Sequence, residues 1–408
     1  MRHRNLLCLS PMVVLLLAIC ASAQTFKILH NFTNGSDGAY PTTPLAFDKA
    51  GNLYGMTGNG GSGSGCPVYG CGTAFEMSQK NGHWGLMPIA QFSSSNGNSP
   101  VPTGLIVVDA KGNIYRADQE GGDASCECGA VVQLTRSGGV WNQTTLHAFL
   151  GGSGDGQNPQ SGLVEDGAGN LYGTTIYGGP NNYGTIYELS PAAGGGWTYN
   201  MIYAFTSQLD GANPVGSLAS DQAGNIYGTS TGGGLYGYGT VFKVSHSGGG
   251  WTVTAIYNFT LDFGNQQQQQ GVAIDGKGNL YGVTQDGGEY QLGTVYELTP
   301  TVGYWNQTVL HTFNGNNDGA FPRGPLTIDQ SGAVYGTAVY GGIHQFGTVY
   351  KLVRGLSGQW NLHALHSFGG TDGFQPENGV TIDASGNLFG TAISGGVYGF
   401  GVVFEITP

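Results

Sequence analysis

The sequence is poor in charged residues, and basic residues are the scarcest among them. Of the 408 residues only 9% are charged, with 13 Lys and Arg against 25 Asp and Glu. Arg2 and Arg4 lie in a predicted export signal, so the rest of the chain is more acidic still. Nucleic-acid binding and docking on anionic membranes both depend on clustered Lys and Arg. The composition therefore argues against both functions.

Helical and catalytic signatures are also missing. No segment of useful length shows the hydrophobic period of a helix, and the 76 glycines do not recur at every third residue as collagen requires. Aromatic residues, 11% of the chain, recur at regular positions, which argues against disorder. The sequence contains no Gly-x-Ser-x-Gly elbow, phosphate-binding loop or His-Glu-x-x-His motif. These absences favour a folded, all-β protein without a recognisable catalytic motif.

Residues 1–23 have the three parts of a cleavable export signal. The basic start is followed by the apolar stretch 6–20 and by the small-x-small cleavage site 21–23. The apolar stretch is too short for a membrane span. A lipoprotein acylated at Cys20 is the alternative, although bulky Ile19 stands where such signals usually have a small residue. We predict a mature chain that starts near Gln24, is secreted or periplasmic, and has no anchor helix at its C-terminus.

Four cysteines remain after the predicted cleavage: Cys66, Cys71, Cys126 and Cys128. An even number in an exported chain suggests two disulfides. Zinc binding is the alternative, but the C-x4-C and C-x-C spacings fit a zinc ribbon poorly. A bridge between Cys126 and Cys128 would be strained, so pairing across the two neighbouring loops stays open.

One unit recurs seven times in the mature chain. The phrase Gly-Asn-Leu/Ile-Tyr, or a close variant, returns at intervals of 61, 57, 55, 54, 54 and 54 residues. Each unit continues with Gly-Gly, a variable stretch, and Gly-Thr-Val-Tyr-Glu-Leu or a variant of it. All six tryptophans share one position of the unit: Trp84, Trp141, Trp197, Trp251, Trp305 and Trp360.

Each unit is predicted to form four short strands. In the sixth unit they span 325–329, 333–338, 348–353 and 360–368, which are rich in β-branched and aromatic residues and bounded by Gly, Asn and Asp. Four-stranded units of this length with a recurring aromatic set are typical of propeller blades. The main alternative is a solenoid, which needs atypical capping repeats at its ends, and the sequence shows none.

The two ends of the mature chain complement each other. The last unit stops after its third strand, and residues 25–32 match a fourth strand. The N-terminal strand would complete the last blade and remove its open edge. We therefore predict that residues 24–408 form a single, monomeric, seven-bladed β-propeller domain of four-stranded blades, closed by the N-terminal strand.

The recurring residues are expected to serve the fold. Asp-x-x-Gly-Asn, between the first two strands, fits a turn in which the Asp accepts backbone amides. The tyrosine that follows it and the tryptophan series are expected to pack within the propeller. One position of the fourth strand holds histidine in some units and tyrosine in others, which favours a polar packing partner over metal ligation. These histidines are His30, His147, His311 and His366.

The best candidate binding surface is the face that carries the inter-blade connections and the loops between second and third strands. An Asp-Gly-x-x-Pro pattern in the connections supplies five carboxylates: Asp37, Asp155, Asp210, Asp318 and Asp372. They could bind a cation or a polyol, or they could serve a plain turn. Calcium needs several oxygens at one point, whereas a ring spreads them apart. We predict no cofactor and leave calcium open.

The other loops of this face carry the candidate aromatic residues Tyr183, Tyr238, Tyr290, Phe346 and Phe400. Exposed rings beside acidic and amide groups suit carbohydrate or peptide binding. The alternative is that each ring packs down on its own blade. Arg323 and His344 are additions peculiar to the sixth unit, and we include both in the candidate surface.

The second unit departs most from the repeat. It replaces Tyr-Gly-Thr-Thr with Tyr115-Arg116-Ala117-Asp118, and Glu120 follows. An acid and a base could be drawn from Asp118, Glu120 and His344, but the sequence does not fix their separation. We therefore assign no catalytic residue.

The units resemble the Gloeo/Verruco-type (GloVer) tandem repeat of exported bacterial proteins. The resemblance lies in residues 169–175 (Gly-Asn-Leu-Tyr-Gly-Thr-Thr), in Gly178-Gly179, in residues 184–189 (Gly-Thr-Ile-Tyr-Glu-Leu), and in their counterparts. It implies a surface or secreted repeat protein, often with a separate anchoring tail, and no such tail follows Pro408. It supplies no catalytic residues.

Taken with the composition, these features predict a secreted, non-catalytic propeller that binds an extracellular carbohydrate or protein. Two alternatives stay open. One is a propeller enzyme, a lyase or hydrolase acting on an extracellular polymer or lactone, and the other is a structural protein of the envelope.

Overall fold

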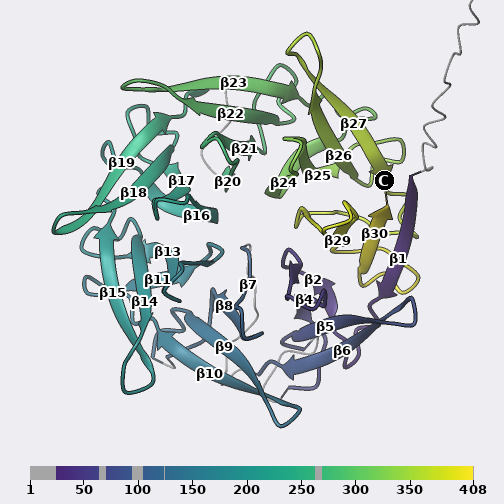
Figure 1. The fold of residues 1–408 in the computed structure, drawn as a ribbon, viewed down its shortest axis with the longest axis horizontal. Helices are drawn as coiled ribbons and strands as arrows, with labels where there is room; N and C mark the ends of the chain where they lie inside the picture. The colour runs from purple at the N-terminus through teal and green to yellow at the C-terminus, as the bar shows by residue number, and fades with distance from the viewer. Residues whose placement is uncertain (1–23, 64–69, 94–103, 124, 262–268, 408) are drawn as a thin grey trace, which may run out of the picture.

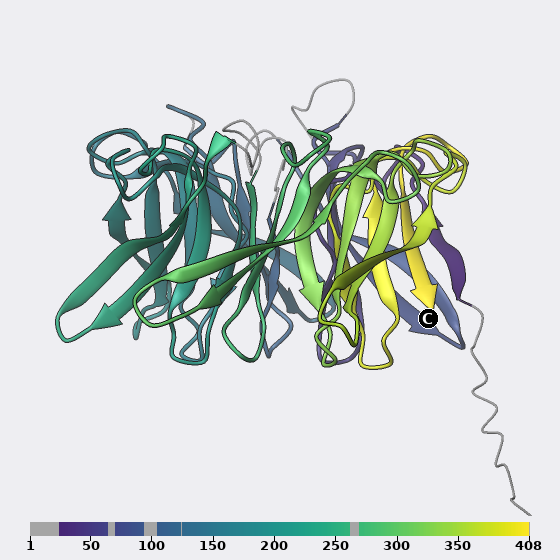
Figure 2. The same ribbon diagram turned by 90° about the horizontal axis from the view of Figure 1, so that it is seen from above.

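The computed structural model describes residues 24–63, 70–93, 104–123, 125–261 and 269–407. The predicted export signal and Cys66 lie outside these residues. Every named element in the described part of the chain is a β-strand. The strands form sheets arranged around a central axis (Figure 1), and seen from the side the sheets stand together in one layer (Figure 2). The protein has an all-β, propeller-like fold.

Five of the six sheets contain four or five strands, and consecutive strands pair antiparallel. The first comprises β2 (Ala39–Pro41), β3 (Ala46–Phe47), β4 (Leu53–Asn59), β5 (Thr73–Lys80) and β6 (His83–Gln91). The second comprises β7 (Val107–Val108), β8 (Ile114–Asp118), β9 (Ala130–Ser137) and β10 (Val140–Ala148). The third comprises β11 (Gly156–Pro159), β12 (Val164–Glu165), β13 (Leu171–Gly178), β14 (Thr185–Pro191) and β15 (Trp197–Ala204). The five-stranded sheets differ only because their first strand is interrupted, so that both pieces pair with the same neighbour.

The sixth unit forms one sheet, and the two units before it share a sheet of eight strands. The shared sheet comprises β16 (Ala212–Ser220), β17 (Ile226–Gly232), β18 (Thr240–Ser247), β19 (Gly250–Asn258), β20 (Gln269–Ile274), β21 (Leu280–Thr284), β22 (Thr294–Pro300) and β23 (Trp305–Thr312). Its halves, β16–β19 and β20–β23, meet in one parallel pairing of Ser217 with Gly271. The sheet of the sixth unit comprises β24 (Ala320–Ile328), β25 (Val334–Tyr340), β26 (Thr348–Arg354) and β27 (Trp360–Ser367), close to the predicted bounds.

The last sheet joins the two ends of the chain. It comprises β28 (Val380–Ile382), β29 (Leu388–Ala392), β30 (Val402–Thr407) and β1 (Thr25–Asn31), and β1 pairs antiparallel with β30. In Figure 1 the purple β1 lies beside the yellow β30. The predicted closure is confirmed, and it excludes the solenoid, whose two ends stay apart.

Each Asp-x-x-Gly-Asn motif folds as a hydrogen-bonded turn. In the first, Asp48 Oδ1 accepts from the amides of Ala50 (2.8 Å) and Asn52 (2.9 Å), and Oδ2 accepts from Asn52 Nδ2 (2.8 Å) and the Tyr54 hydroxyl (3.1 Å). The same four bonds recur at Asp109, Asp166, Asp221 and Asp275. The predicted structural role of this motif is confirmed.

These turns should make stability sensitive to acid. Burial raises the pKa of Asp221, but hydrogen bonds from Asn225, Tyr227 and the backbone outweigh it, so the pKa lies below its ordinary value of 3.8. A lowered native pKa gives stability that is complete above pH 3.8 and is lost as the pH falls through the native pKa. We expect Asp221→Asn to lower the free energy of unfolding by about 1–2 kcal/mol at pH 7. Urea titrations should show this difference shrinking below about pH 4. Glu289→Gln, at an exposed loop carboxylate, is the matched control, and a pH-independent difference for Asp221→Asn would contradict the assignment.

Aromatic pairs join successive units, as predicted for the tyrosine and tryptophan series. The ring of Tyr54 meets Trp141 edge to face, with centroids 6.1 Å apart. Four further pairs repeat this contact along the chain: Tyr115–Trp197, Tyr172–Trp251, Tyr227–Trp305 and Tyr281–Trp360. Phe389 meets Trp84 in the same way, with centroids 5.5 Å apart, and so links the last sheet to the first. Such contacts add to the energy of burial between sheets.

The Asp-Gly-x-x-Pro connections link each sheet to the next. In the third connection Asn213 has a φ of 55° and donates its amide to the Tyr183 carbonyl (2.8 Å). The following residue, Pro214, packs against Gly184, where an added Cβ would lie 2.7 Å from the Pro214 Cδ. Gly184 also has a φ of 93°, so both the backbone conformation and the lack of space for a side chain require glycine here. The same arrangement recurs at Tyr40, Asn158, Phe321 and Gln375.

Candidate functional site

The propeller-like ring has two different faces (Figure 2). We call the face that carries the inter-sheet connections and the loops between second and third strands the loop-bearing face. We call the opposite face, with the Asp-x-x-Gly-Asn turns and the hairpins between third and fourth strands, the turn-bearing face. All of the residues predicted for a binding surface lie on the loop-bearing face.

The five carboxylates of the connections are held within their own loops. Asp155 lies 3.1 Å from His147 Nε2 and accepts from the amides of Leu150 (2.9 Å) and Gly156 (2.7 Å). Histidine is the partner again in the pairs His30–Asp37, His311–Asp318 and His366–Asp372, and Tyr203 donates to Asp210. The polar partner predicted for the histidine position is therefore this carboxylate. The arrangement favours the plain-turn interpretation of the motif.

The protonation of these pairs reflects the same contacts. Burial raises the pKa of Asp37, but hydrogen bonds from Thr33 and His30 outweigh it and leave the pKa below its ordinary value. The pKa of Asp155 is lowered in the same way, by His147 and Tyr199 against burial. Burial lowers the pKa of His366 more than Asp372 raises it. The carboxylates of Asp37 and Asp155 thus stay ionised and hydrogen-bonded at neutral pH.

The predicted loop aromatics divide into exposed and packed rings. Tyr290 is 53% exposed, Tyr183 40% and Phe346 37%, whereas Tyr238 and Phe400 pack partly into the core clusters of their sheets. In the last five units the loop runs Gly-Gly, two outward residues, a left-handed residue, and then a downward position that holds a ring or leucine. Tyr238, Leu292 and Phe400 at the downward position pack against core clusters, whereas Tyr183 and Phe346 at the same position stay exposed. Neither the prediction of exposed binding rings nor the alternative of packed rings therefore holds for all five residues.

The outward pair after Gly-Gly adds to the tyrosines of these loops aliphatic residues that the sequence analysis did not assign. Exposed side chains at these two positions are Leu235, Tyr236, Tyr290, Ile343, Val397 and Tyr398. Exposed leucines in the connections add to them: Leu150, Leu209 and Leu261. The two positions counted from each Gly-Gly would have found the first group, because the glycines fix the direction of the loop.

Four rings gather where β24 and β25 approach the connection to the last sheet. Phe374 meets Phe346 (centroids 5.1 Å apart) and Tyr340 (6.2 Å), and Tyr340 meets Phe321 (6.1 Å). Tyr340 also accepts a hydrogen bond from the Gln375 side chain (2.8 Å). Phe321 holds a φ of 57°, a conformation that bulky residues rarely adopt. These contacts make a partly exposed aromatic cluster on the loop-bearing face.

Arg323 links three units rather than standing free. Its Nε donates to Gln285 Oε1 (2.6 Å), and its Nη1 donates to Glu377 Oε2 (2.8 Å). Glu377 precedes β28 of the last sheet, and Gln285 follows β21. Arg323 therefore neutralises Glu377 and ties the sixth unit to the units on either side of it.

The structure does not bring together the acid and base considered for catalysis. Asp118 is 0% exposed and lies 2.8 Å from the Nη2 of Arg116, itself 1% exposed. Burial raises the pKa of Asp118 to about 6, although Arg116 lowers it. Glu120 and His344 are exposed, but His344 lies between β25 and β26, with the sheets of β4 and β29 standing between it and β8. The burial of Asp118 against Arg116 argues against Asp118 as an acid or base, and Glu120 and His344 belong to loops of different sheets.

Cys126 and Cys128 are bonded to each other, the connectivity that their close spacing disfavoured. Glu127, between the two cysteines, has a left-handed φ of 51°. Cys71 is also in a disulfide. Cys128 and Cys71 occupy the downward position that holds a ring in other units. Among the described residues, no group of three His, Cys, Asp or Glu could hold a metal ion.

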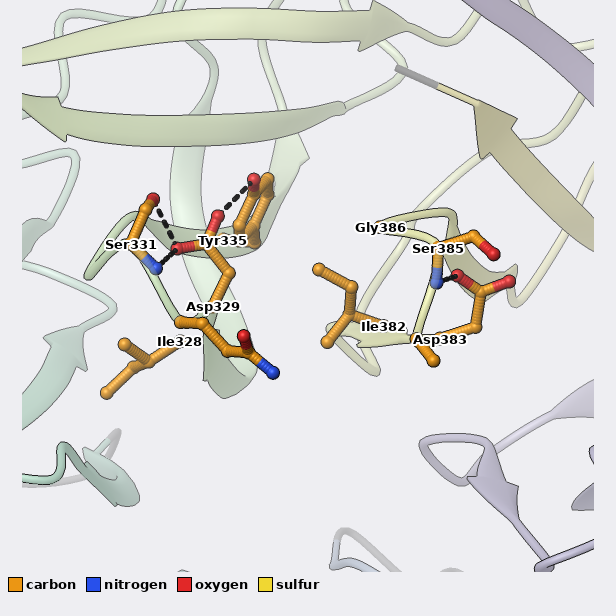
Figure 3. Close-up of a pocket in the computed structure, with 10 residues that line it drawn as sticks. Ile328, Asp329, Ser331, Tyr335, Ile382, Asp383, Ser385 and Gly386 are labelled. Atoms are coloured by element: carbon orange, nitrogen blue, oxygen red, sulfur yellow. Dashed lines mark hydrogen bonds between the residues drawn. The ribbon is translucent and has the colours of Figure 1, made fainter.

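The turn-bearing face has grooves between successive turns. One, with a volume of about 600 Å³, is lined by Ile328, Asp329, Ser331, Ile382 and Asp383 (Figure 3). Both carboxylates accept hydrogen bonds inside their own turns, Asp329 from Ser331 and Tyr335, and Asp383 from Ser385. Similar grooves recur between other turns. They are a consequence of the repeat rather than a distinct site.

The fold and the loops place the chain among the propeller-like, all-β proteins. Residues 102–333 and 267–408 match the model of the Gloeobacter/Verrucomicrobia repeat, and the chain belongs to this family. The predicted resemblance is thus confirmed. No curated protein is similar enough in sequence to match the chain. Within the described residues, no helix is long and apolar enough to cross a membrane.

Several solved structures share the fold at low identity. A candidate 6-phosphogluconolactonase from Bacteroides uniformis ATCC 8492 is 15% identical, with a TM-score of 0.52 over 84% of this chain and 89% of its own. The extracellular domain of a candidate one-component system from B. thetaiotaomicron is 9% identical, with a TM-score of 0.54 over 92% of this chain and 40% of its own. A candidate oxidoreductase (glucose dehydrogenase) from Thermus thermophilus is 15% identical, with a TM-score of 0.44 over 94% of this chain and 100% of its own. These likenesses concern the fold alone.

Proposed function

We propose that the protein is a secreted, non-catalytic binding scaffold whose loop-bearing face captures an extracellular carbohydrate or protein. In this proposal each half of the eight-stranded sheet is one blade, so that seven blades form the ring. The export signal predicted in residues 1–23 supports an extracellular or periplasmic location. The scaffold acts as a monomer without a cofactor.

The observation that carries the proposal is the distribution of exposed apolar side chains. Soluble proteins rarely expose large apolar patches without an interaction to explain them. Here the outward loop positions, the connection leucines and the aromatic cluster all lie on one face. On the turn-bearing face the exposed apolar residues lie at separate hairpin tips, such as Val302 and Tyr304 at one tip and Leu356 at another.

A binding screen with matched surface variants tests this function. The loop-face variant carries Tyr236→Ser, Tyr290→Ser and Tyr398→Ser, and the turn-face variant carries Val302→Ser, Tyr304→Ser and Leu356→Ser. Because all six side chains are exposed, both variants should keep the wild-type unfolding temperature. The mature protein is screened against immobilised polysaccharides and peptides, with calcium and with chelator.

We expect the loop-face variant to lose at least about tenfold in affinity for whatever the wild type retains, and the turn-face variant to bind within about twofold. Loss of binding by the turn-face variant alone would mean that the site lies on the turn-bearing face, and it would contradict the proposal. Silence of the wild type across the screen would favour the alternative of a structural envelope protein. Chelator sensitivity would show that calcium takes part.

A further inference from the structure

The loop-bearing face also differs from the rest of the molecule in its charge. In the described part of the chain Arg323 is the one Lys or Arg that is even partly exposed on this face, and Glu377 already neutralises it. The segments outside the described residues contribute no further cation between the export signal and the C-terminus, because their sequences contain no Lys or Arg.

The basic residues are instead gathered towards the turn-bearing face. They lie in its turns and hairpins or at the adjoining strand ends: Lys27, Lys49, Lys80, Lys111, Arg136, Lys277 and Arg354. Lys243 and Lys351 lie over the rings of Tyr227 and Tyr335, 5.7 and 5.1 Å from their centroids. Both rings belong to tyrosines that donate to turn aspartates, which places these lysines beside the turn-bearing face as well.

Acidic residues have no such bias and leave the loop-bearing face with unopposed negative charge. Glu120, Glu127 and Glu289 are exposed there, and Asp123 and Asp286 are partly exposed. Glu289 stands directly beside Tyr290 in an outward pair, and Glu127 stands between the bonded cysteines. Carboxylates and exposed apolar side chains therefore share one surface.

The apolar part of this surface is aliphatic as well as aromatic. Leu150, Leu209, Leu235, Ile343 and Val397 are all exposed. Sugars are recognised through flat ring faces and hydrogen bonds, and these aliphatic side chains offer neither. They suit the apolar side chains of another polypeptide, as at the centres of protein–protein interfaces.

Resting on the proposed function, we infer that the occupant of the loop-bearing face is a protein segment that presents Lys or Arg beside apolar side chains. The apolar residues supply the buried contact, and the unopposed carboxylates attract the cations and repel acidic competitors. Binding should weaken with salt, because exposed charges are screened beyond the Debye length.

Two synthetic peptides of equal length test this inference. The basic peptide alternates lysine with leucine and one tryptophan, and the acidic peptide has glutamate in place of each lysine. Affinities for the mature protein are measured by fluorescence anisotropy of a dye-labelled peptide. The loop-acid variant carries Glu120→Gln, Glu127→Gln and Glu289→Gln. Its control, with the same change in net charge, carries Glu165→Gln, Glu188→Gln and Glu405→Gln near the turn-bearing face.

We expect the basic peptide to bind at least about tenfold more tightly than the acidic one, and this preference to fall between about 0.05 and 0.5 M salt. The loop-acid variant and the loop-face variant should each lose about tenfold, and the turn-side control should stay within about twofold. Equal loss in the turn-side control would mean that net charge alone attracts the peptide, and it would overturn the inference. So would binding of neither peptide.

The outcomes separate this inference from the proposed function. If the acidic peptide or a polysaccharide binds, and the loop-face variant loses it, the binding face is right and the basic partner is wrong. If the basic peptide binds the loop-face variant as well as the wild type, the binding face itself is wrong.

Discussion

Replacing Asp118 by alanine is expected to lower the free energy of unfolding by about 3–5 kcal/mol, because it leaves the buried Arg116 guanidinium without its counter-charge. Arg116 is enclosed by Phe92, whose ring centre lies 3.8 Å away, and by the sulfur of Met56 at 3.9 Å. The cation–π contact with Phe92 and the contact with the sulfur stabilise the positive charge less than the carboxylate does. Urea denaturation followed by tryptophan fluorescence at pH 7 measures the change.

The repeat itself offers the control. In the neighbouring sheet Gly173, Thr175 and Tyr187 occupy the positions of Arg116, Asp118 and Val132. The small Val132 leaves room that the Arg116 side chain fills in place of the ring. The triple variant Arg116→Gly, Asp118→Thr, Val132→Tyr should therefore recover most of the loss, since a buried ion pair is often replaceable by well-packed apolar groups. A mild Asp118→Ala combined with a severely unstable triple variant would contradict this account.

Deleting residues 24–33, which contain β1, is expected to abolish the soluble monomer. Phe32 is 0% exposed, and Phe26 packs on His366 (ring centroids 3.6 Å apart) and Phe404. A single buried Phe→Ala change typically costs about 3–5 kcal/mol, and the deletion also leaves β30 as an unpaired edge prone to association. Size-exclusion chromatography and thermal unfolding should show aggregation and a large fall in the unfolding temperature.

Supplying the missing strand in trans tests whether closure is the cause. A synthetic peptide of residues 24–34 should restore monomer and unfolding temperature, because it can pair with β30 as an added strand. The same peptide with Phe26, Ile28 and Phe32 replaced by serine should not. A deletion variant that stays monomeric and stable without any peptide would mean that the ring does not depend on this closure.

The fold could be predicted from the sequence because its signals are periodic. The interval between Gly-Asn-Leu-Tyr phrases, the single position of every tryptophan and the match of residues 25–32 to a fourth strand together indicated the sheets and their closure. The Asp turns could be predicted as well, because an Asp four residues before Asn between two strands is typical of a hydrogen-bonded turn.

The site could not be predicted to the same depth because it depends on which way each loop residue points. Tyr236 and Tyr238 are two residues apart, yet one is exposed and the other packs down, and Gly237 between them decides this through its φ of 81°. Asp118 looked available for catalysis because its partner, Arg116, was considered separately. Val132 stands at the position of the third strand where the neighbouring sheet has the ring of Tyr187. That missing ring was the signal that could have shown Arg116 and Asp118 to be buried.

Hydrogen–deuterium exchange of the mature protein, with and without the ligand retained in the binding screen, tests the central claim most directly. The account predicts slower exchange in the loops 233–239, 287–293, 341–347 and 395–401, and no change in the Asp turns. Protection confined to the turns around Asp329 and Asp383, with the loops unchanged, would contradict it and would move the binding site to the turn-bearing face.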